Sequence, residues 1–278
     1  MDDLVTTEWL AGQLGADDLA ILDCSMFMPA MGRNAATEYD AEHIPGAGFL
    51  DIDAVSDHSQ PAPHMLPSAA QFGAAMEALG VGRDDRIVVY DNSPLRSAAR
   101  GWFMLRHFGA EKVAILDGGL GKWLAESRPV ERGAPAPKTG KRFEAEERRD
   151  VVDKAALLAG VGAVLLDARP KTRFEGSEPD PRVGVGTGHI PGARNLPMGE
   201  VYRTDGTFKS PDELCAAFAA AGVDPAQPFV ASCGSGVTAN SLIFAARLIG
   251  GGDAARLYDG SWSEWGADPE TPKALGPA

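Results

Sequence analysis

The sequence predicts an α/β protein in which one unit is used twice, each copy being a mostly parallel sheet flanked by helices. Short apolar runs alternate with helical patterns along the chain. The second half repeats the first at a nearly fixed offset, and a segment rich in proline, glycine and charge separates the halves. A tandem duplication of an α/β domain accounts for all three observations.

The first copy shows the expected elements in order. Residues 20–24, 86–91 and 112–119 are short apolar runs typical of buried strands, and residues 67–80 and 97–109 have the apolar spacing of helices. Strands separated by helices of this length form βα units, whose parallel strands are covered by helices on both faces. Ligands bind open sheets of this kind at the carboxyl ends of the strands.

The second copy can be aligned with the first. Residues 229–265 lie under residues 87–123 without a gap, at an offset of 142 that places Cys233 opposite Asp91. A His-Ile-Pro-Gly-Ala segment also occurs in both copies, at an offset of 146. This change of offset predicts a net insertion of four residues in the second copy, near residues 175–186.

The domain boundaries follow from the repeat and from composition. Residues 129–149 carry the proline, glycine and charge of a linker rather than of a packed element. We therefore expect one domain over residues 1–128 and a second over residues 150–278. Because Asp91 occupies the position of the second copy's thiol, we expect the first domain to be non-catalytic.

Composition excludes several classes of function. The 278 residues are 44% hydrophobic and contain no apolar run near the roughly 18 residues of a membrane span. A net charge of -13 disfavours nucleic acid and anionic membranes as partners. Cys24, Cys215 and Cys233 are odd in number and lack the spacing of zinc sites, so we expect no metal and at least one free thiol. The first residues lack the basic and apolar regions of a secretory signal, which favours a cytoplasmic location.

The segment after the strand-like residues 228–232 carries the chemistry. Cys233 is followed by Gly234, Ser235 and Gly236, which do not bury a thiol as apolar neighbours would. Two glycines allow the backbone to curl so that its N–H groups point inward, and the following helix directs its positive end to the same place. Such a nest favours the thiolate, the nucleophilic form. A phosphatase would need arginine six positions after the cysteine, where this chain has Ala239, so a persulfide suits the nest better than a phosphate.

These motifs together resemble a known family. The paired His-Ile-Pro-Gly-Ala segments, "DGGLGKW", "DGSWSEW" and above all "CGSGVT" are similar to the two-domain sulfurtransferases of the rhodanese superfamily. The resemblance covers almost the whole chain. It implies tandem rhodanese-like domains and a covalent persulfide on Cys233, with no other cofactor. It assigns the persulfide-binding loop to Gly234, Ser235, Gly236, Val237 and Thr238.

The resemblance also implies a donor. Thiosulfate enzymes of the family carry basic residues after the cysteine, whereas this loop has Gly234 and Ser235, as in the branch that uses 3-mercaptopyruvate. Arg173 and Arg182 match the family's pair that grips the carboxylate and keto oxygen of that donor, a task suited to the guanidinium fork. Their alternative role is that of ordinary surface charges in a loop.

The resemblance implies that Ser235 hydrogen-bonds near the donor thiol and that His43 belongs to a proton relay. The acid of that relay falls on Asn34, which orients a histidine but does not stabilise its cation. The alternative for His43 is to brace its turn, because His189 occupies the equivalent turn. Asp23, Asp167 and Asp259 are assigned structural roles.

Two other functions remain open at this point. One is an enzyme that prefers thiosulfate, and the other is a persulfide carrier or binding module that serves a partner protein. The expected acceptors are a small thiol, a thioredoxin-like protein or cyanide, with no nucleic acid and no membrane. An internal duplication already provides two domains, so we expect a monomer.

Overall fold

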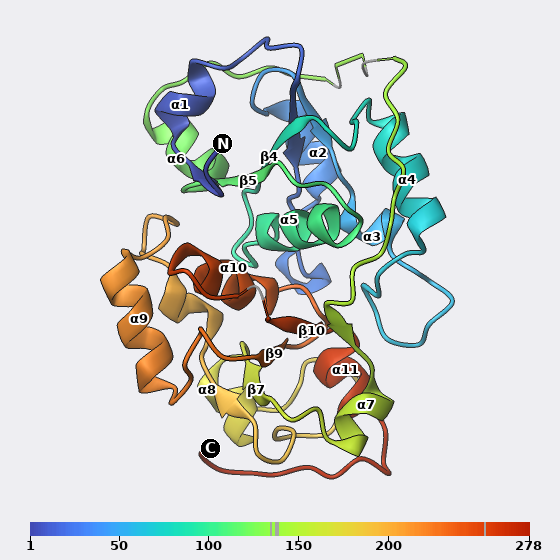
Figure 1. The fold of residues 1–278 in the computed structure, drawn as a ribbon, viewed down its shortest axis with the longest axis vertical. Coiled ribbons are helices and arrows are strands. Elements are labelled where there is room, and N and C mark those ends of the chain that lie inside the picture. Colours follow the sequence, from blue (N-terminus) through green and yellow to red (C-terminus); the bar gives the residue numbers. More distant parts are fainter. Residues whose placement is uncertain (134, 137–138, 253) are drawn as a thin grey trace. The chain divides into compact units, whose positions relative to one another are not determined.

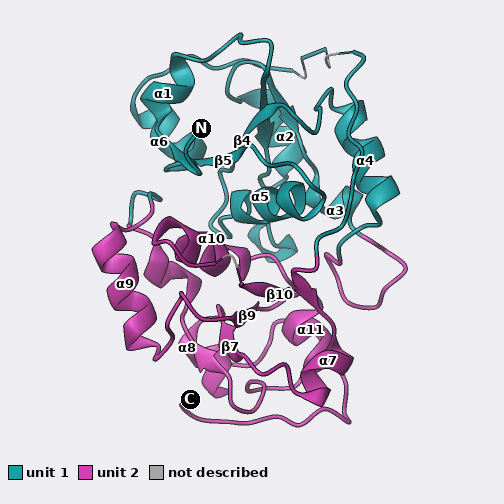
Figure 2. Ribbon diagram, in the orientation of Figure 1, with its two compact units in different colours: residues 1–56, 66–148, 204–207 teal, residues 57–65, 149–203, 208–278 magenta. Residues whose placement is uncertain are grey.

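The computed structural model describes residues 1–133, 135–136, 139–252 and 254–278. Positions 134, 137 and 138 of the expected linker lie outside the described residues. The chain forms two compact units (Figure 2). The first contains residues 1–56, 66–148 and 204–207, and the second contains residues 57–65, 149–203 and 208–278.

The first unit is a five-stranded parallel sheet with the strand order β1-β5-β4-β2-β3. Its strands are β1 (Leu4–Val5), β2 (Leu19–Asp23), β3 (Ala47–Phe49), β4 (Arg86–Tyr90) and β5 (Val113–Leu116). Its helices are α1 (Thr7–Ala11), the 3-10 turn η1 (Pro29–Met31), α2 (Ala35–Ala41), α3 (Ile52–Val55), α4 (Ala69–Ala78), α5 (Ala98–His107) and α6 (Gly119–Ala125) (Figure 1).

The second unit repeats this topology, with the parallel strand order β6-β10-β9-β7-β8. Its strands are β6 (Val151–Val152), β7 (Val164–Asp167), β8 (Arg194–Asn195), β9 (Phe229–Ser232) and β10 (Arg256–Tyr258). Its helices are α7 (Lys154–Ala159), α8 (Lys171–Glu175), the 3-10 turn η2 (Met198–Val201), α9 (Pro211–Ala220), α10 (Asn240–Leu248) and α11 (Ser261–Trp265). The predicted α/β class, with a parallel sheet in each copy, is confirmed.

Equivalent tryptophans pack into the cores of the two units. Trp123 of α6 and Trp265 of α11 are buried, and each indole N–H donates to a proline carbonyl further along the chain, at 2.7 and 2.8 Å. Buried indoles need such an acceptor because an unpaired N–H is costly in an apolar core. A capping box begins one ten-residue helix in each unit, α4 at Ser68 and α9 at Ser210.

The units differ in the segments beside their histidine turns. Tyr39 and His43 are four positions apart, whereas the equivalent pair Phe174 and His189 is fifteen positions apart. The insertion expected near residues 175–186 is therefore present, but its predicted size of four residues is wrong. The change of offset does not measure this insertion: it falls from 146 at the histidines to 142 at Cys233, because the first copy has four more residues between His43 and Asp91 than the second has between His189 and Cys233. Before the histidine turns, the first copy has nine more residues between Asp23 and Tyr39 than the second has between Asp167 and Phe174, which hides most of the eleven-residue difference.

Cys24 has a packing role. It is fully buried after β2, and its side chain lies against Gly101 of α5. A methyl group on Gly101 would overlap Sγ of Cys24 and lie 3.2 Å from its Cβ. The close approach of α5 to the sheet thus requires glycine at this position.

We expect Gly101→Ala to lower the free energy of unfolding by about 1–2 kcal/mol, because overpacking outweighs the gain in helix propensity. Denaturant unfolding measures the change. Gly121→Ala is the control, because Gly121 is an exposed residue of α6 and a methyl group added there meets nothing within 4 Å. Adding Cys24→Ala should recover part of the loss, and no recovery would contradict the assigned contact.

Candidate active site

Cys233 directly follows β9, at the carboxyl end of a strand that lies between β10 and β7. Residues 233–239 form a loop that leads into α10. Gly236 takes a φ of 73°, in the left-handed region that favours glycine. A Cβ at this position would lie 2.8 Å from Oδ1 of Asp259. The glycine therefore allows the loop to curl tightly against the end of β10.

The first two peptide groups of the loop are oriented by α11. The carbonyl oxygens of Cys233 and Gly234 accept hydrogen bonds from the backbone N–H groups of Trp262 and Ser263, at 3.0 and 2.8 Å. All peptides in the described chain are trans, so the N–H of each peptide points opposite to its carbonyl. The N–H groups of Gly234 and Ser235 are thereby directed away from α11.

Asn240 orients the next part of the loop. Its buried Nδ2 donates to the carbonyl oxygens of Gly236 and Val237, at 2.7 and 2.9 Å. The N–H groups of Val237 and Thr238 therefore point away from Asn240. Sequence reasoning missed Asn240, although the alignment of the two copies would have shown it, because the first copy has Ala98 there.

The loop consequently presents a series of backbone amides that no described residue accepts. Among the described residues no hydrogen-bond acceptor exists for the backbone N–H groups of Gly234, Ser235, Val237, Thr238 and Ala239. Unpaired backbone amides in largely buried surroundings are costly, and successive amides of this kind form anion sites. The loop is built to accept a negative charge from outside the backbone.

Ser261 fixes the base of the loop. Its Oγ accepts from the N–H groups of Cys233 and Gly236, at 3.0 and 3.1 Å, and lies 3.9 Å from Sγ of Cys233. The residue has a φ of 49°, which is unusual for a side chain other than glycine. The first unit has Gly119 at the equivalent position, so the second unit tolerates backbone strain to place a hydroxyl there.

The equivalent loop of the first unit is closed by its own side chain. The carboxylate of Asp91 accepts from the N–H groups of Ser93 and Ala98, at 2.9 and 2.7 Å. Burial raises the pKa of Asp91, and these two amides act in the opposite direction. Asn92 and Leu95 also donate to serine hydroxyls. No comparable site is left in this loop for an external anion.

The expectation that glycines leave Cys233 unburied is wrong. The residue is only 1% exposed. Its Sγ lies 3.9 Å from Oγ of Ser261, which the chain brings from 28 positions away. Small neighbours in sequence do not expose a side chain that is covered by residues distant in the sequence.

Arg182 lies directly against the loop. A Cβ on Gly234 would be 2.7 Å from Nη2 of Arg182 and 3.5 Å from Nη1. Nη1 is 3.2 Å from both carboxylate oxygens of Asp180, whose Oδ1 also accepts from the backbone N–H of Arg182. Gly234 therefore makes room for a guanidinium against the residue that follows the cysteine.

Arg173 of α8 is held by a different acid. Its Nε donates to Oε1 of Glu178 at 3.0 Å, while Thr172 Oγ1 donates to Oε2 at 2.7 Å. The two Nη groups of Arg173 have no partner among the described residues. The end of this guanidinium fork is thus available to a ligand.

Several contacts hold the inserted segment that carries Arg182. The N–H of Gly186 donates to the carbonyl of Gly266, and its own carbonyl accepts from Nε1 of Trp262, both at 2.9 Å. Arg169 forms a buried bidentate pair with Asp167 and donates to the carbonyl of Gly188. Arg169 and Asp167 thus form a buried structural ion pair, and Trp262 holds the inserted segment through its indole N–H.

Ser235 has a partner that the sequence did not reveal. Its Oγ shares a 2.8 Å hydrogen bond with Nδ1 of His64. His64 lies in the segment 57–65, which belongs to the second unit. His64 has a φ of 62°, a strained conformation of the kind found at functional sites. No spacing in the sequence connects two residues that lie 171 positions apart.

Comparison with known proteins identifies the repeated unit. The family described as "Rhodanese-like domain" matches residues 6–126 and again residues 151–268. The chain belongs to this family. The predicted resemblance and the tandem rhodanese-like architecture are therefore confirmed.

Individual relatives match nearly the whole chain. The 3-mercaptopyruvate sulfurtransferase of Escherichia coli (strain K12) is 43% identical over 272 residues, which is 96% of each chain. The thiosulfate sulfurtransferase of Rattus norvegicus is 41% identical and covers 96% of this chain and 94% of its own. The crystal structure of SseA from Escherichia coli, a 3-mercaptopyruvate sulfotransferase, matches 95% of this chain at 42% identity, with a TM-score of 0.85, and is itself covered completely.

His43 and His189 make the same contacts in the two rhodanese-like units. Nδ1 of His43 bonds the carbonyl of Tyr39 at 2.7 Å, and Nδ1 of His189 bonds that of Phe174 at 2.8 Å. Each imidazole stacks on the same aromatic ring whose carbonyl it contacts, and both are buried. These contacts confirm the turn-bracing role.

The relay role of His43 stays a prediction. Its expected partner Asn34 caps α2 instead, with Oδ1 accepting from the N–H of Thr37 at 2.8 Å. Nε2 of His43 is buried and has no hydrogen-bond partner among the described residues. Within the first unit, no described side chain serves as the acid of such a relay at this nitrogen.

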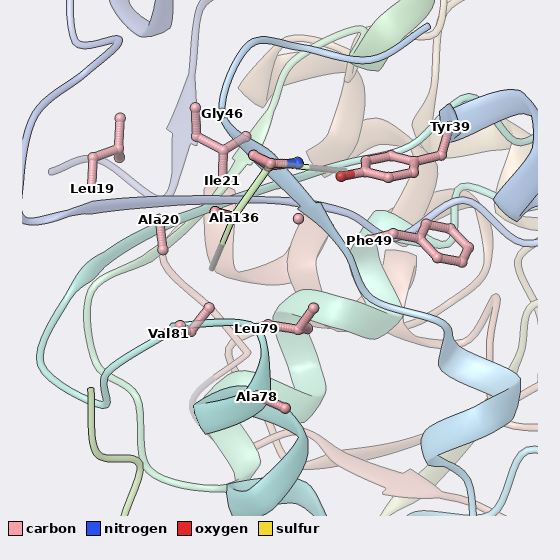
Figure 3. Close-up of a pocket in the computed structure, with 13 residues that line it drawn as sticks. Leu19, Ala20, Ile21, Tyr39, Gly46, Phe49, Ala78, Leu79, Val81 and Ala136 are labelled. Atoms are coloured by element: carbon pink, nitrogen blue, oxygen red, sulfur yellow. The ribbon is translucent and has the colours of Figure 1, made fainter. Parts of the chain in front are cut away.

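Other features of the rhodanese-like units carry no comparable chemistry. A pocket of about 400 Å³ in the first unit is lined by aliphatic and aromatic side chains of β2, β3 and α4 (Figure 3). Among the described residues that line it, the one titratable group is Tyr39, whose hydroxyl donates to the carbonyl of Ala47 and whose pKa is raised by burial to about 12. Among the described residues there is no group of acids, histidines and cysteines that could hold a metal, and no helix long and apolar enough to cross a membrane.

We expect Gly234→Ala to displace Arg182 while leaving the fold intact, because the added methyl meets the flexible end of a side chain. The ratio of Cys233 alkylation rates with iodoacetate and iodoacetamide should then fall roughly 3- to 10-fold, since a partly screened charge pair contributes about 1 kcal/mol. Gly199→Ala, which meets nothing within 4 Å, is the control. An unchanged ratio would place Arg182 away from the thiol.

Proposed function

We propose that this protein is a sulfurtransferase that moves sulfane sulfur from 3-mercaptopyruvate, through a persulfide on Cys233, to a thiol or cyanide, releasing pyruvate. One observation carries the proposal: a cysteine stands at the base of a loop in which five backbone amides, those of residues 234, 235, 237, 238 and 239, lack acceptors among the described residues. Inward amides stabilise a thiolate before the reaction and a persulfide anion after it. Relatives named for either donor, 3-mercaptopyruvate or thiosulfate, are sulfurtransferases, which agrees with sulfur transfer as the reaction.

The first half-reaction forms the persulfide. The thiolate of Cys233 attacks the sulfur of mercaptopyruvate, a new S–S bond forms, and the C–S bond breaks with its electron pair remaining on carbon. The resulting enolate takes up one proton and leaves as pyruvate. Because charge moves from one sulfur to a neighbouring sulfur and onto the leaving group, fixed N–H donors around the site serve both states of the cysteine.

Arg173 and Arg182 are the proposed donor-binding residues. In support, Arg182 lies against Gly234, the residue after Cys233, and the Nη groups of Arg173 have no hydrogen-bond partner among the described residues. A guanidinium binds a carboxylate through two parallel hydrogen bonds and so fixes the orientation of the donor. The sulfur of a donor held in this way can be presented to the nucleophile.

The hydrogen-bonded pair of Ser235 and His64 is the proposed proton carrier. The 2.8 Å contact lets the hydroxyl exchange its proton with the imidazole, a side chain that acts as a proton donor and acceptor in many enzymes. The pair therefore supplies the proton that the enolate needs and removes one from an incoming acceptor thiol. The His43 relay is not needed for this scheme.

The two domains have different proposed roles. Residues 150–278 form the catalytic domain and residues 1–128 the non-catalytic one, joined by residues 129–149. The support is chemical: Asp91 fills the first loop with its own carboxylate, whereas five backbone amides of the second loop have no acceptor among the described residues.

Thiosulfate is the specific alternative to 3-mercaptopyruvate as the sulfur donor. Thiosulfate sulfurtransferase relatives are nearly as similar as the mercaptopyruvate enzymes. A dianion favours a site with excess positive charge, but Gly234 and Ser235 add none, and Arg182 and Arg173 are each paired with an acid. This balance favours the singly charged mercaptopyruvate.

The cellular setting follows from the thiol chemistry. The cysteines at positions 24, 215 and 233 are all free, as suits a reducing compartment, and we propose a cytoplasmic monomer. Small thiols, thioredoxin-like proteins and cyanide are the proposed acceptors. Each can provide a nucleophile that takes the outer sulfur and returns Cys233 to its thiolate.

Incubation with 3-mercaptopyruvate should add the mass of one sulfur atom to the peptide that contains Cys233. Intact-protein and peptide mass spectrometry measure it. Cys233→Ser should lose both the addition and all turnover, with an unchanged melting temperature. Cys215→Ser, a change of an exposed thiol on α9, is the control. Sulfur addition that persists in Cys233→Ser would overturn the proposal.

Arg173→Gln should reduce kcat/KM for 3-mercaptopyruvate by roughly 10- to 100-fold, the loss expected for a hydrogen bond to a charged group. Turnover of thiosulfate should fall less, because that donor has no carboxylate. Arg203→Gln removes a comparably paired arginine from the same unit and is the control. Equal losses with both donors would contradict the carboxylate role.

A further inference from the structure

Both arginines of the proposed donor site are already paired with acids from the same segment. Glu178 lies 3.0 Å from Arg173, and Asp180 lies 3.2 Å from Arg182. Hydrogen bonds from Thr172 and Arg173 lower the pKa of Glu178, which is therefore ionised at neutral pH. The site thus contains two positive and two negative groups before any donor binds.

The acids occupy only part of each guanidinium. Glu178 contacts Arg173 through Nε alone, and Asp180 contacts Arg182 through Nη1 and the backbone N–H. Nη2 of Arg182 and both Nη groups of Arg173 keep their hydrogen-bonding capacity, because they have no partner among the described residues. The pairing removes net charge from the site without removing the donors that recognise a carboxylate.

We propose that Asp180 and Glu178 are specificity-determining residues that keep the donor site electrically neutral, so that it accepts monoanionic sulfur donors and disfavours dianionic ones. This inference rests on the proposed function of the same site. A carboxylate such as that of mercaptopyruvate still finds free guanidinium N–H groups. A second negative charge, as in thiosulfate, finds no excess positive charge and adds to the repulsion from the thiolate of Cys233.

Asp180 should have the larger effect. Its side chain is 3% exposed, whereas that of Glu178 is 46% exposed and surrounded by solvent that screens its charge. Asp180 is also paired with the arginine that lies against the cysteine loop. Removal of its charge therefore changes the potential at the thiol more than removal of the charge of Glu178.

The test compares Asp180→Asn and Glu178→Gln, which remove a charge and keep the shape. Asp224→Asn is a matched control, because Asp224 accepts a backbone N–H two positions ahead just as Asp180 does. Glu213→Gln is the control for Glu178, since Glu213 pairs with Arg203 and keeps its capping role as glutamine. Each protein is assayed with 3-mercaptopyruvate and with thiosulfate at low and high ionic strength.

We expect the ratio of kcat/KM for thiosulfate to that for mercaptopyruvate to rise roughly tenfold in Asp180→Asn and about 2- to 3-fold in Glu178→Gln, consistent with removal of a buried and of a solvent-screened charge. In both variants the thiosulfate reaction should also become more sensitive to salt, because the site then carries net positive charge. A purely structural role would lower both activities without this salt dependence. The controls should leave the ratio unchanged.

Two results would overturn the inference: a donor ratio that stays constant in both variants, or one that moves toward mercaptopyruvate. If Asp180→Asn does not fold, Glu178→Gln decides the question on its own, because its side chain is exposed. Failure of the proposed function is a separate result, in which mercaptopyruvate places no sulfur on Cys233 of the unmodified protein. A protein that forms the persulfide but shows no change of ratio in either variant retains the proposed function and loses this inference.

Discussion

The orientation of four peptide groups in the loop after β9 is the constraint on which the site depends. Two carbonyls are held by the amides of α11 and two by the side chain of Asn240, so the trans geometry of the peptides turns their N–H groups the other way. The chain thereby accepts several unpaired amides, which a stable fold ordinarily avoids. A negative charge on or near Cys233 offsets the free-energy cost of these unpaired amides by accepting their hydrogen bonds.

The first unit shows that the fold does not require this arrangement. It has the same strand order and the same histidine turn, yet Asp91 provides a carboxylate for its own loop. Its loop lacks the equivalent of Asn240, and Gly119 replaces the strained serine. A duplicated scaffold can therefore keep its core while one copy satisfies its loop amides with its own carboxylate and the other leaves five of them without an acceptor among the described residues.

Much of this organisation could be predicted from the sequence. Periodicity and turn residues are local patterns, and the internal repeat is visible when the two halves of the chain are aligned. These fixed the α/β class, the duplication and the position of the cysteine loop. Contacts over long separations could not be predicted. Ser261 reaches the loop across 28 positions and His64 meets Ser235 across 171, and the burial of Cys233 depends on which way the loop faces. The insertion was misjudged because an offset reports only the sum of several length changes.

Gly234 connects the nucleophile with donor recognition. Its N–H belongs to the inward amides, and its missing side chain leaves the space that Arg182 occupies. A larger residue at this position would keep the amide but displace the guanidinium, so the site could retain a reactive thiolate while losing its hold on a carboxylate. The sulfur chemistry and the choice of donor are thus separable in principle, because the first depends on backbone orientation and the second on side-chain volume and charge. On the proposed function, substitutions at Gly234 and at the acids beside the two arginines therefore act on donor choice, while the backbone that would hold a persulfide stays the same.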